Sequence, residues 1–254
     1  MKVVAIIQAR MASTRRPEKV LFEILGKPLI EHLITRLKAV EKLNEIVLAT
    51  TEQPEDDVLE DWAQVNSYFC FRGSQDNVLS RFYQCAVKCK ADVIVRVTAD
   101  DPLKDPVVIA HAIELFLKDS ELDYVSNTIK PSYPEGIDIE VFSFWALKQA
   151  YESAIKTSDL EHVTPYIWRH PQDFRLLNFE AKNDFSHVRL TVDYQEDLNV
   201  VSEVMTHFKD QPLVGYQEIV EYLKCNPEIS AVNSSILRNE GYLQSTINEE
   251  LNER

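Results

Sequence analysis

The sequence contains few cysteines, no long apolar run and no internal repeat. Its four cysteines in 254 residues do not resemble the disulfide framework of a secreted protein. Cys85 and Cys89 lie one helical turn apart, but no histidine or third cysteine stands near them at metal-ligand spacing. No apolar stretch approaches the roughly 18 residues that cross a bilayer, and residues 2–7 are not followed by a cleavage-site pattern. We therefore expect a cytoplasmic protein that is neither secreted nor inserted into a membrane.

Positive charge is also scarce. The chain has 27 Lys and Arg against 41 Asp and Glu, which gives a net charge of −14. Nucleic acids and anionic membranes bind basic surfaces that replace their counterions, so we expect neither as a partner. An anionic ligand must instead meet a local concentration of cations.

The first half of the chain alternates strand-like apolar runs with segments of helical periodicity. Hydrophobic residues make up 45% of the chain, enough for one large domain or one domain with an added lobe. The predicted strands cover residues 2–7, 45–51, 68–72 and 92–98, and the predicted helices cover 28–40, 54–65, 77–90 and 106–117. This alternation predicts an α/β fold with a Rossmann-like, mostly parallel sheet sandwiched by helices.

After residue 123 the pattern loosens, and we predict a short strand and then a small inserted lobe at about residues 128–172. Such a lobe is the usual place for a second-substrate pocket or a dimer contact. The predicted elements are a strand at 137–142, helices at 146–155 and 160–168, strands at 174–179 and 188–192 that return to the sheet, and helices at 196–208 and 217–224. We expect a main domain over residues 1–225 and a peripheral tail over 226–254, polar and frayed toward its end.

The loop after the first strand concentrates positive charge in an otherwise acidic protein. Within residues 8–19 it carries four cations: Arg10, Arg15, Arg16 and Lys19. Ligands of such sheets bind beyond the carboxyl ends of the strands, where cations and loop N–H groups suit a phosphate cradle. The loop lacks the GxxxxGKS/T motif of a P-loop. A triphosphate is the natural ligand, and a solvated basic loop is the alternative.

Two acidic turns follow other predicted strands. Asp100 and Asp101 come right after the fourth predicted strand, and Asp193 follows the last one. Carboxylate oxygens are the ligands that Mg²⁺ prefers. If the two strands are neighbours, Asp100 and Asp193 meet and can hold one Mg²⁺ opposite the basic loop, as nucleotidyl transfer requires. We interpret Asp105 as the cap of the following helix.

Several long motifs carry a resemblance to a known family. IIQARMASTRRPEKVL and LGKPLIEHLITRL resemble the opening of the CMP-sugar synthetases, the cytidylyltransferase superfamily that activates Kdo and sialic-type acids with CTP. Five further motifs are most similar to its spore coat polysaccharide biosynthesis branch, often called SpsF-like: RGSQDNVLSRF, RVTADDPLKDP, PEGIDIEVFSFWAL, LEHVTPYIWRHP and RLTVDYQEDL. The resemblance covers residues 2–208. It implies the nucleotide-diphospho-sugar transferase type of fold, and a Mg²⁺-dependent homodimer that joins CTP to a sugar acid and releases pyrophosphate.

The resemblance also implies roles for individual residues. The catalytic, phosphate-binding cations are Arg10, Arg15 and Lys19, and the metal ligands are Asp100 and Asp193. Nucleotide contacts fall on Gln8, Ala9, Arg10, Ser13, Arg72, Gly73, Ser74, Arg81 and Thr98. The sugar-acid side falls on Glu135, Gly136, Asp138, Glu140 and His162, the last of which has packing or a subunit contact as its alternative.

Two departures from the family pattern leave other functions open. Glu18 stands where the family has a glycine beside the triphosphate, and Ala99 replaces the glycine before the metal-binding aspartate. One alternative is therefore a nucleotide-binding protein with weakened catalysis. Another is a glycosyltransferase that uses a nucleotide sugar, although those enzymes carry a DxD-type metal motif and this chain has the adjacent pair Asp100 and Asp101.

Overall fold

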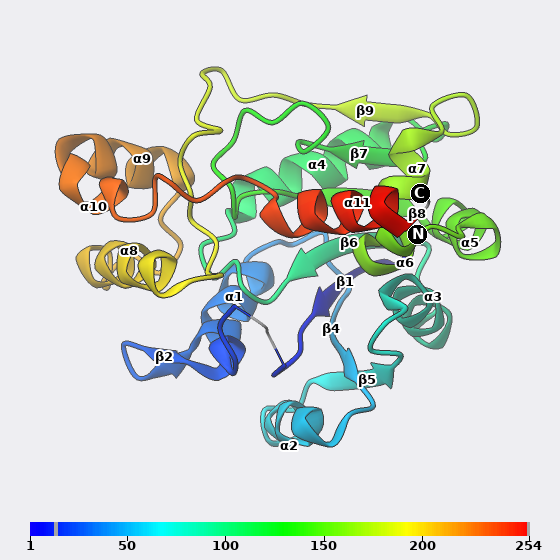
Figure 1. Ribbon diagram of the computed structural model, residues 1–254, viewed down its shortest axis with the longest axis horizontal. Helices are drawn as coiled ribbons and strands as arrows, with labels where there is room; N and C mark the ends of the chain where they lie inside the picture. Colours follow the sequence, from blue (N-terminus) through cyan, green and yellow to red (C-terminus); the bar gives the residue numbers. More distant parts are fainter. Residues whose placement is uncertain (13–14, 253–254) are drawn as a thin grey trace.

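The computed structural model describes residues 1–12 and 15–252 (Figure 1). These residues form a seven-stranded sheet in the order β5-β4-β1-β6-β8-β7-β9 and a separate two-stranded hairpin. β8 runs antiparallel to β6 and β7, and the other pairings of the large sheet are parallel. The strands are β1 (Val3–Gln8), β4 (Glu45–Thr51), β5 (Phe69–Gly73), β6 (Val93–Thr98), β7 (Tyr124–Ser126), β8 (Glu140–Ser143) and β9 (Leu176–Asn178), with β2 (Glu23–Ile24) and β3 (Lys27–Pro28) in the hairpin.

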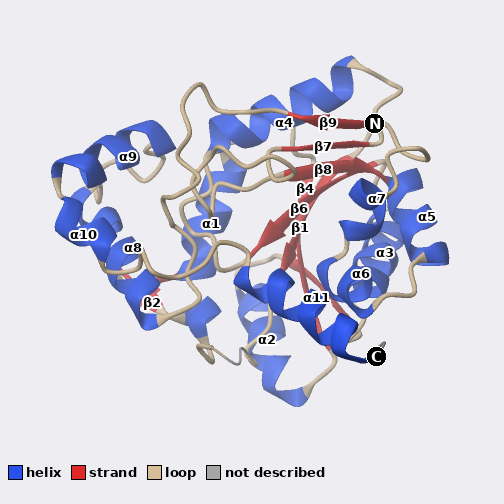
Figure 2. Ribbon diagram, turned by 45° about the horizontal axis from the view of Figure 1, so that its top comes forward, coloured by secondary structure: helices blue, strands red, loops and turns tan. Residues whose placement is uncertain are grey.

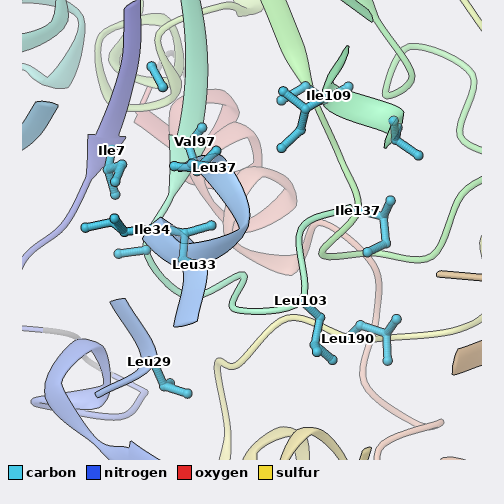
Figure 3. Packing of buried hydrophobic residues seen from close by; sticks show 14 of the residues in the cluster. Ile7, Leu29, Leu33, Ile34, Leu37, Val97, Leu103, Ile109, Ile137 and Leu190 are labelled. Atoms are coloured by element: carbon cyan, nitrogen blue, oxygen red, sulfur yellow. The ribbon is translucent and has the colours of Figure 1, made fainter. Parts of the chain in front are cut away.

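Helices cover both faces of the sheet (Figure 2), because successive side chains of each buried strand point to opposite faces. On one face, Ile7 of β1 packs in a cluster with Leu33 and Leu37 of α1 (Figure 3). On the other, Ile6 packs with Phe82 of α3. The first face is covered by α1 (Leu29–Lys38), α2 (Asp57–Val65), α4 (Pro106–Lys118), α8 (Gln195–His207) and α9 (Tyr216–Cys225); the second by α3 (Val78–Cys89), α5 (Phe144–Ser153), α6 (Thr157–His162) and α7 (Pro165–Arg169).

The α/β fold is therefore confirmed, and the first half matches the predicted elements closely. β4 has the predicted bounds, and the other early elements differ by a few residues at their ends. The short 3-10 helices η1 (Lys19–Leu21) and η2 (Pro54–Asp56) precede β2 and α2. No helix of the described residues is long and apolar enough to cross a membrane.

The predicted strand at 188–192 is not a strand in the structure. Its alternating apolar residues are buried, which is the pattern of a strand, but its backbone bonds to loops. The N–H of Leu190 donates to the carbonyl of Glu135 at 2.8 Å, and the N–H of Val192 donates to the carbonyl of Asp100 at 2.9 Å. An extended segment that is buried against loops therefore shows the same alternation of apolar residues as a strand.

The segment predicted as an inserted lobe is joined to the main body. It supplies β8 to the interior of the sheet, and its helix α5 packs against α3. The single helix predicted at 160–168 is divided into α6 and α7, because Val163 adopts a positive φ of 73° and Pro165 starts a new helix.

The C-terminal tail is helical rather than frayed. It forms α10 (Pro227–Ala231) beside α9, and then α11 (Glu240–Asn252), which lies beside α6 in both views (Figures 1 and 2). α11 therefore returns the end of the chain to the body of the protein.

Candidate active site

The basic loop is anchored at the carboxyl ends of β1 and β4. The N–H of Met11 donates to Oδ1 of the buried Asp56 at 2.6 Å, and Oδ2 of Asp56 accepts a short hydrogen bond from the Thr51 hydroxyl. The loop closes on itself through the N–H of Glu18, which donates to the carbonyl of Met11 at 2.9 Å. Glu18 does so with a φ of 62°, a left-handed conformation that favours glycine.

Lys19, at the end of this loop, lies between the two acidic turns. Its Nζ is 2.6 Å from Oδ2 of Asp100 and 2.8 Å from Oδ1 of Asp193, and it also donates to the carbonyl of Val192 at 2.8 Å. The hydrogen bond from Val192 to Asp100 holds the two turns side by side. Asp100 and Asp193 thus lie together, as predicted, although the segment before Asp193 is not a strand.

The charges of this cluster support one another. Burial lowers the pKa of Lys19, but Asp100 and Asp193 raise it further, so the net shift is upward and the ammonium stays charged. Burial raises the pKa of Asp193, but Lys19, Arg15 and Arg189 lower it to about 2. Asp100 differs, because burial and the neighbouring acids raise its pKa against the attraction of Lys19. The cluster therefore contains a charged lysine and a strongly ionised aspartate.

Arg189 is a supporting residue that the sequence analysis missed. Its guanidinium lies 3.0 Å from Oδ2 of Asp193, 2.8 Å from Asp197 and 2.6 Å from Glu135. Asp197 in turn accepts the backbone N–H groups of Asp193 and Tyr194 at 3.0 Å each. Arg189 thus fixes the turn that presents Asp193. The available signal was a cation inside an alternating apolar run, four residues before an aspartate.

The other cations of the basic loop differ in what they contact. Nη2 of Arg15 lies 2.5 Å from Asp193, and Arg16 donates to Gln195 at 2.6 Å. Arg10 is exposed, and its guanidinium has no hydrogen-bond or ion-pair partner among residues 1–12 and 15–252. Burial and the charge of Arg10 lower the pKa of Arg81 to about 10. Arg10 and Arg81 therefore place two positive charges close together.

Arg81 comes from α3 and lies under the turn that follows β5. Its side chain is buried, its Nη1 donates to the carbonyl of Ser74 at 2.8 Å, and its Nε is buried without a partner among the described residues. A Cβ on Gly73 would lie 3.1 Å from Cγ of Arg81 and 3.1 Å from the ring of Phe71. The glycine therefore makes room for the buried arginine.

Arg72 does not join this group, and its guanidinium contacts α2 instead. It lies 2.6 Å from Asp57 and 2.9 Å from Glu60, and its Nε donates to the carbonyl of Thr51. These contacts hold β5 to α2, and the nucleotide contact expected of Arg72 stays a prediction. The sequence pattern located the turn correctly but could not show which way the side chain points.

The remaining predicted nucleotide residues lie at the ends of β1 and β6. Oε1 of Gln8 is 3.5 Å from Arg96, and Ala9 is buried directly after β1. The Thr98 hydroxyl donates to Asp101 at 2.5 Å and so shapes the turn that carries Asp100. Asp105 caps α4, as predicted. Ser13 lies outside the described residues.

On the predicted sugar-acid side, the turn around Gly136 packs against the backbone before Asp193. Gly136 has a φ of 98°, and a Cβ there would lie 2.7 Å from backbone atoms of Leu190 and Thr191. Glu140, in contrast, is buried and bound by Arg96, by the Tyr124 hydroxyl at 2.6 Å and by the Thr164 hydroxyl at 2.5 Å. Glu140 therefore stabilises the sheet, and its contact with substrate stays a prediction.

Three other residues of the sugar-acid side contact the C-terminal segment. Asp138 pairs with Arg238, Oε1 of Glu135 accepts the N–H of Asn239 at 2.9 Å, and Nε2 of His162 lies 3.1 Å from the Ser245 hydroxyl. These contacts join residues about 80 to 105 positions apart in the chain, so the sequence carried no local signal for them.

Asp100 and Asp193 converge on one cation, the ammonium of Lys19, and were predicted to bind Mg²⁺. Among the described residues no group of three or more His, Cys, Asp or Glu side chains could hold a metal ion. Asp100 and Asp193 nevertheless present oxygens to a common point, which Lys19 Nζ fills. They fit a Mg²⁺ ion whose other ligands come from a phosphate or from water.

Comparison with known proteins identifies the family of this chain. A family model described as Cytidylyltransferase matches residues 4–234. The spore coat polysaccharide biosynthesis protein SpsF of Bacillus subtilis is 31% identical over 237 residues, which cover 89% of this chain and 95% of that protein.

Solved structures show the same fold. A cytidylyltransferase from Leptospira borgpetersenii has a TM-score of 0.88 and 30% identity, and the match covers 94% of this chain and 100% of that one. The structure of CMP:2-keto-3-deoxy-manno-octonic acid synthetase complexed with CTP has a TM-score of 0.64 and 18% identity, with 82% and 99% covered, and shares the fold.

Proposed function

Because the chain belongs to the cytidylyltransferase family and is a nucleotidyltransferase that uses CTP, we propose that it activates a sugar acid for the synthesis of a surface polysaccharide. The name of the Bacillus relative supports the polysaccharide, and that of the synthetase with the same fold supports a Kdo- or nonulosonic-acid-like acceptor. The observation that carries the proposal is the convergence of Lys19, Asp100 and Asp193 beside the basic loop.

In the proposed reaction the anomeric hydroxyl of the sugar acid attacks the α-phosphorus of CTP and gives up its proton to water. The bond to the β-phosphate breaks, and the pair of electrons leaves with pyrophosphate. Arg10, Arg15 and Lys19 bind the phosphates and offset the charge that builds on the leaving group. Asp100 and Asp193 would hold Mg²⁺, which supplies further charge neutralisation and lowers the pKa of the attacking hydroxyl.

Lys19 has two sets of partners in this proposal. In the structure it neutralises Asp100 and Asp193. A triphosphate offers the ammonium equally strong anionic partners, so Lys19 can pass from the carboxylates to phosphate when nucleotide binds. The two aspartates then have their oxygens available for a metal ion.

The test is release of pyrophosphate from each nucleoside triphosphate in the presence of Mg²⁺ and a panel of sugar acids that includes Kdo. We expect release with CTP and one of the acids, and a loss of at least 100-fold in K19A and D100A, consistent with the effect of removing a charged transition-state contact. K42A serves as the control, because exposed Lys42 pairs with Glu114 of α4 and lies just before β4, at the end of that strand opposite to the basic loop. Wild-type release in both K19A and D100A would remove these roles.

A nucleotide-binding protein with weakened catalysis is the second candidate. The left-handed backbone of Glu18 favours it, because an acid occupies a glycine conformation within the proposed phosphate loop. Calorimetry that detects CTP binding, with no turnover across the panel of acids, would support this candidate. Incubation with preformed nucleotide sugars in place of CTP tests the glycosyltransferase alternative.

We also infer a cytoplasmic location and a homodimer. The supply of CTP in the cytoplasm supports the location, and the family resemblance supports the dimer. Light scattering of the purified protein gives the mass to compare with the 29.3 kDa chain.

A further inference from the structure

Helix α11 joins the two sides of the candidate site. At its start, Oε2 of Glu240 accepts the Tyr194 hydroxyl at 2.6 Å and lies 3.8 Å from Nη1 of Arg15. One turn later, the Ser245 hydroxyl donates to Glu161 of α6 at 2.8 Å. The helix therefore runs from the basic loop to α6 (Figures 1 and 2), where it meets His162, one of the residues that we assign to the sugar acid.

The same segment contacts most of the proposed sugar-acid side. Arg238 pairs with Asp138, and the N–H of Asn239 donates to Glu135. Ser245 also lies 3.1 Å from His162. Residues 238–245 thus already use the polar groups that would bind an acceptor.

Few apolar contacts attach α11 to the body. Leu243, Ile247 and Leu251 lie on one stripe of the helix and are 45%, 51% and 63% exposed. The inner side is attached mainly by hydrogen bonds and by the ring of Tyr242 against Trp168. A helix held by polar contacts exchanges them for water at small cost, so α11 can leave its position at a low free energy of opening.

Glu240 and a bound triphosphate compete for Arg15. Arg15 belongs to the proposed phosphate-binding set, and Glu240 places a carboxylate close to its guanidinium. A phosphate bound at Arg15 would repel the Glu240 carboxylate, and phosphate oxygens are the stronger partners of an arginine. A triphosphate at Arg15 therefore weakens the attachment of the start of α11.

We propose that residues 238–252, the segment that begins at Arg238 and ends in α11, form a strap that covers the sugar-acid side of the site, and that nucleotide binding at Arg15 releases it. This inference rests on the proposed function for the assignment of Arg15. It implies an ordered reaction in which CTP binds first and the sugar acid enters after the strap has opened.

Hydrogen exchange of the full chain, with and without CTP and Mg²⁺, tests the release. We expect slower exchange in the loop between β1 and η1, and at least tenfold faster exchange in α11. A protected loop with unchanged or slower exchange in α11 overturns the strap and leaves the proposed function standing. If CTP fails to protect the loop, the proposed function and the strap are both overturned.

Glu240→Gln removes the competing charge, and Glu250→Gln is the matched control on the same helix, since Glu250 is exposed. We expect E240Q to bind CTP about three- to tenfold more tightly than the wild type, because one partly exposed carboxylate no longer competes for Arg15. E250Q is expected to bind CTP with the affinity of the wild type. Equal affinities for the wild type and E240Q overturn the proposal.

A second variant guards against a local effect of the glutamine. A chain that ends at Asn239 keeps the contacts of Arg238 and Asn239 with the body and removes α11 alone. It is expected to bind CTP at least as tightly as E240Q. Weaker binding by this variant, with a native circular dichroism spectrum, would show that α11 assists the nucleotide and would overturn the strap.

Discussion

Nζ of Lys19 lies 2.6 Å from Oδ2 of Asp100, in the position that a divalent ion would take between the two aspartates. If Asp100 and Asp193 hold a metal ion as proposed, the ammonium and that ion exclude each other. Lys19→Met is expected to raise the affinity for Mn²⁺ in the absence of nucleotide at least tenfold, because the two carboxylates lose their internal cation. Electron paramagnetic resonance of free Mn²⁺ measures this binding without any need for turnover.

The control for this variant is Lys42→Met, which removes an exposed cation far from the aspartates. Circular dichroism checks that both variants are folded. Equal Mn²⁺ affinities in K19M, K42M and the wild type would contradict the exclusion.

Glu18→Gly is expected to stabilise the protein or leave its stability unchanged. Glu18 has a φ of 62°, and a left-handed residue other than glycine costs about 1 kcal/mol. Glycine removes this cost, but its greater conformational freedom in the unfolded chain offsets part of the gain. Urea unfolding measures the difference. Glu23→Gly in β2 is the comparison, since glycine in an ordinary extended strand lowers stability by about 0.5–1 kcal/mol. A measurable loss of stability in E18G would contradict the prediction.

Gly136→Ala is expected to destabilise the protein by more than about 2 kcal/mol, because the new Cβ meets backbone rather than a movable side chain. Gly26→Ala is the control without a close contact, so the difference between the two variants isolates the steric cost at Gly136. Gly26 also has a positive φ, of 73°, but nothing lies within 4 Å of its Cβ position, so we expect a loss of about 1 kcal/mol. Thermal unfolding of the two variants compares them directly, and equal losses would show that the close contact at Gly136 is unimportant.

The protein is expected to lose stability as the pH falls below 6.5, because the buried His162 ring resists protonation. Burial lowers its pKa to about 4, although Glu161 opposes this, so the folded protein holds the neutral ring. The unfolded chain takes up the proton near pH 6.5, and the contribution of His162 is complete above that pH and lost as the pH falls toward 4. By pH 5 the loss reaches about 2 kcal/mol.

His162→Gln keeps a polar group for Ser245 and removes the titration. The difference in free energy of unfolding between the wild type and H162Q should therefore shrink between pH 6.5 and 5. A difference that stays constant over this range would contradict the assigned pKa.

Local periodicity was sufficient to predict the first half of the fold, because the buried strands and their amphipathic helices each carry their own signal. Periodicity left the meeting of Asp100 and Asp193 conditional on neighbouring strands, and only the family resemblance paired them as metal ligands; the structure shows that they lie together. The position of Lys19 between them, the support from Arg189 and the direction of Arg72 depend on contacts between distant segments. α11 escaped prediction for a related reason: its apolar stripe faces solvent, so its pattern does not resemble a helix that covers a core.

Gly73 and Arg81 show how one position limits another. The aliphatic part of the Arg81 side chain occupies the space that any side chain at residue 73 would need. Across homologous chains the two positions are therefore expected to covary, with a larger residue at the first accompanied by a shorter one at the second. A family alignment that shows independent drift at these sites would indicate that the arginine can be accommodated in another way.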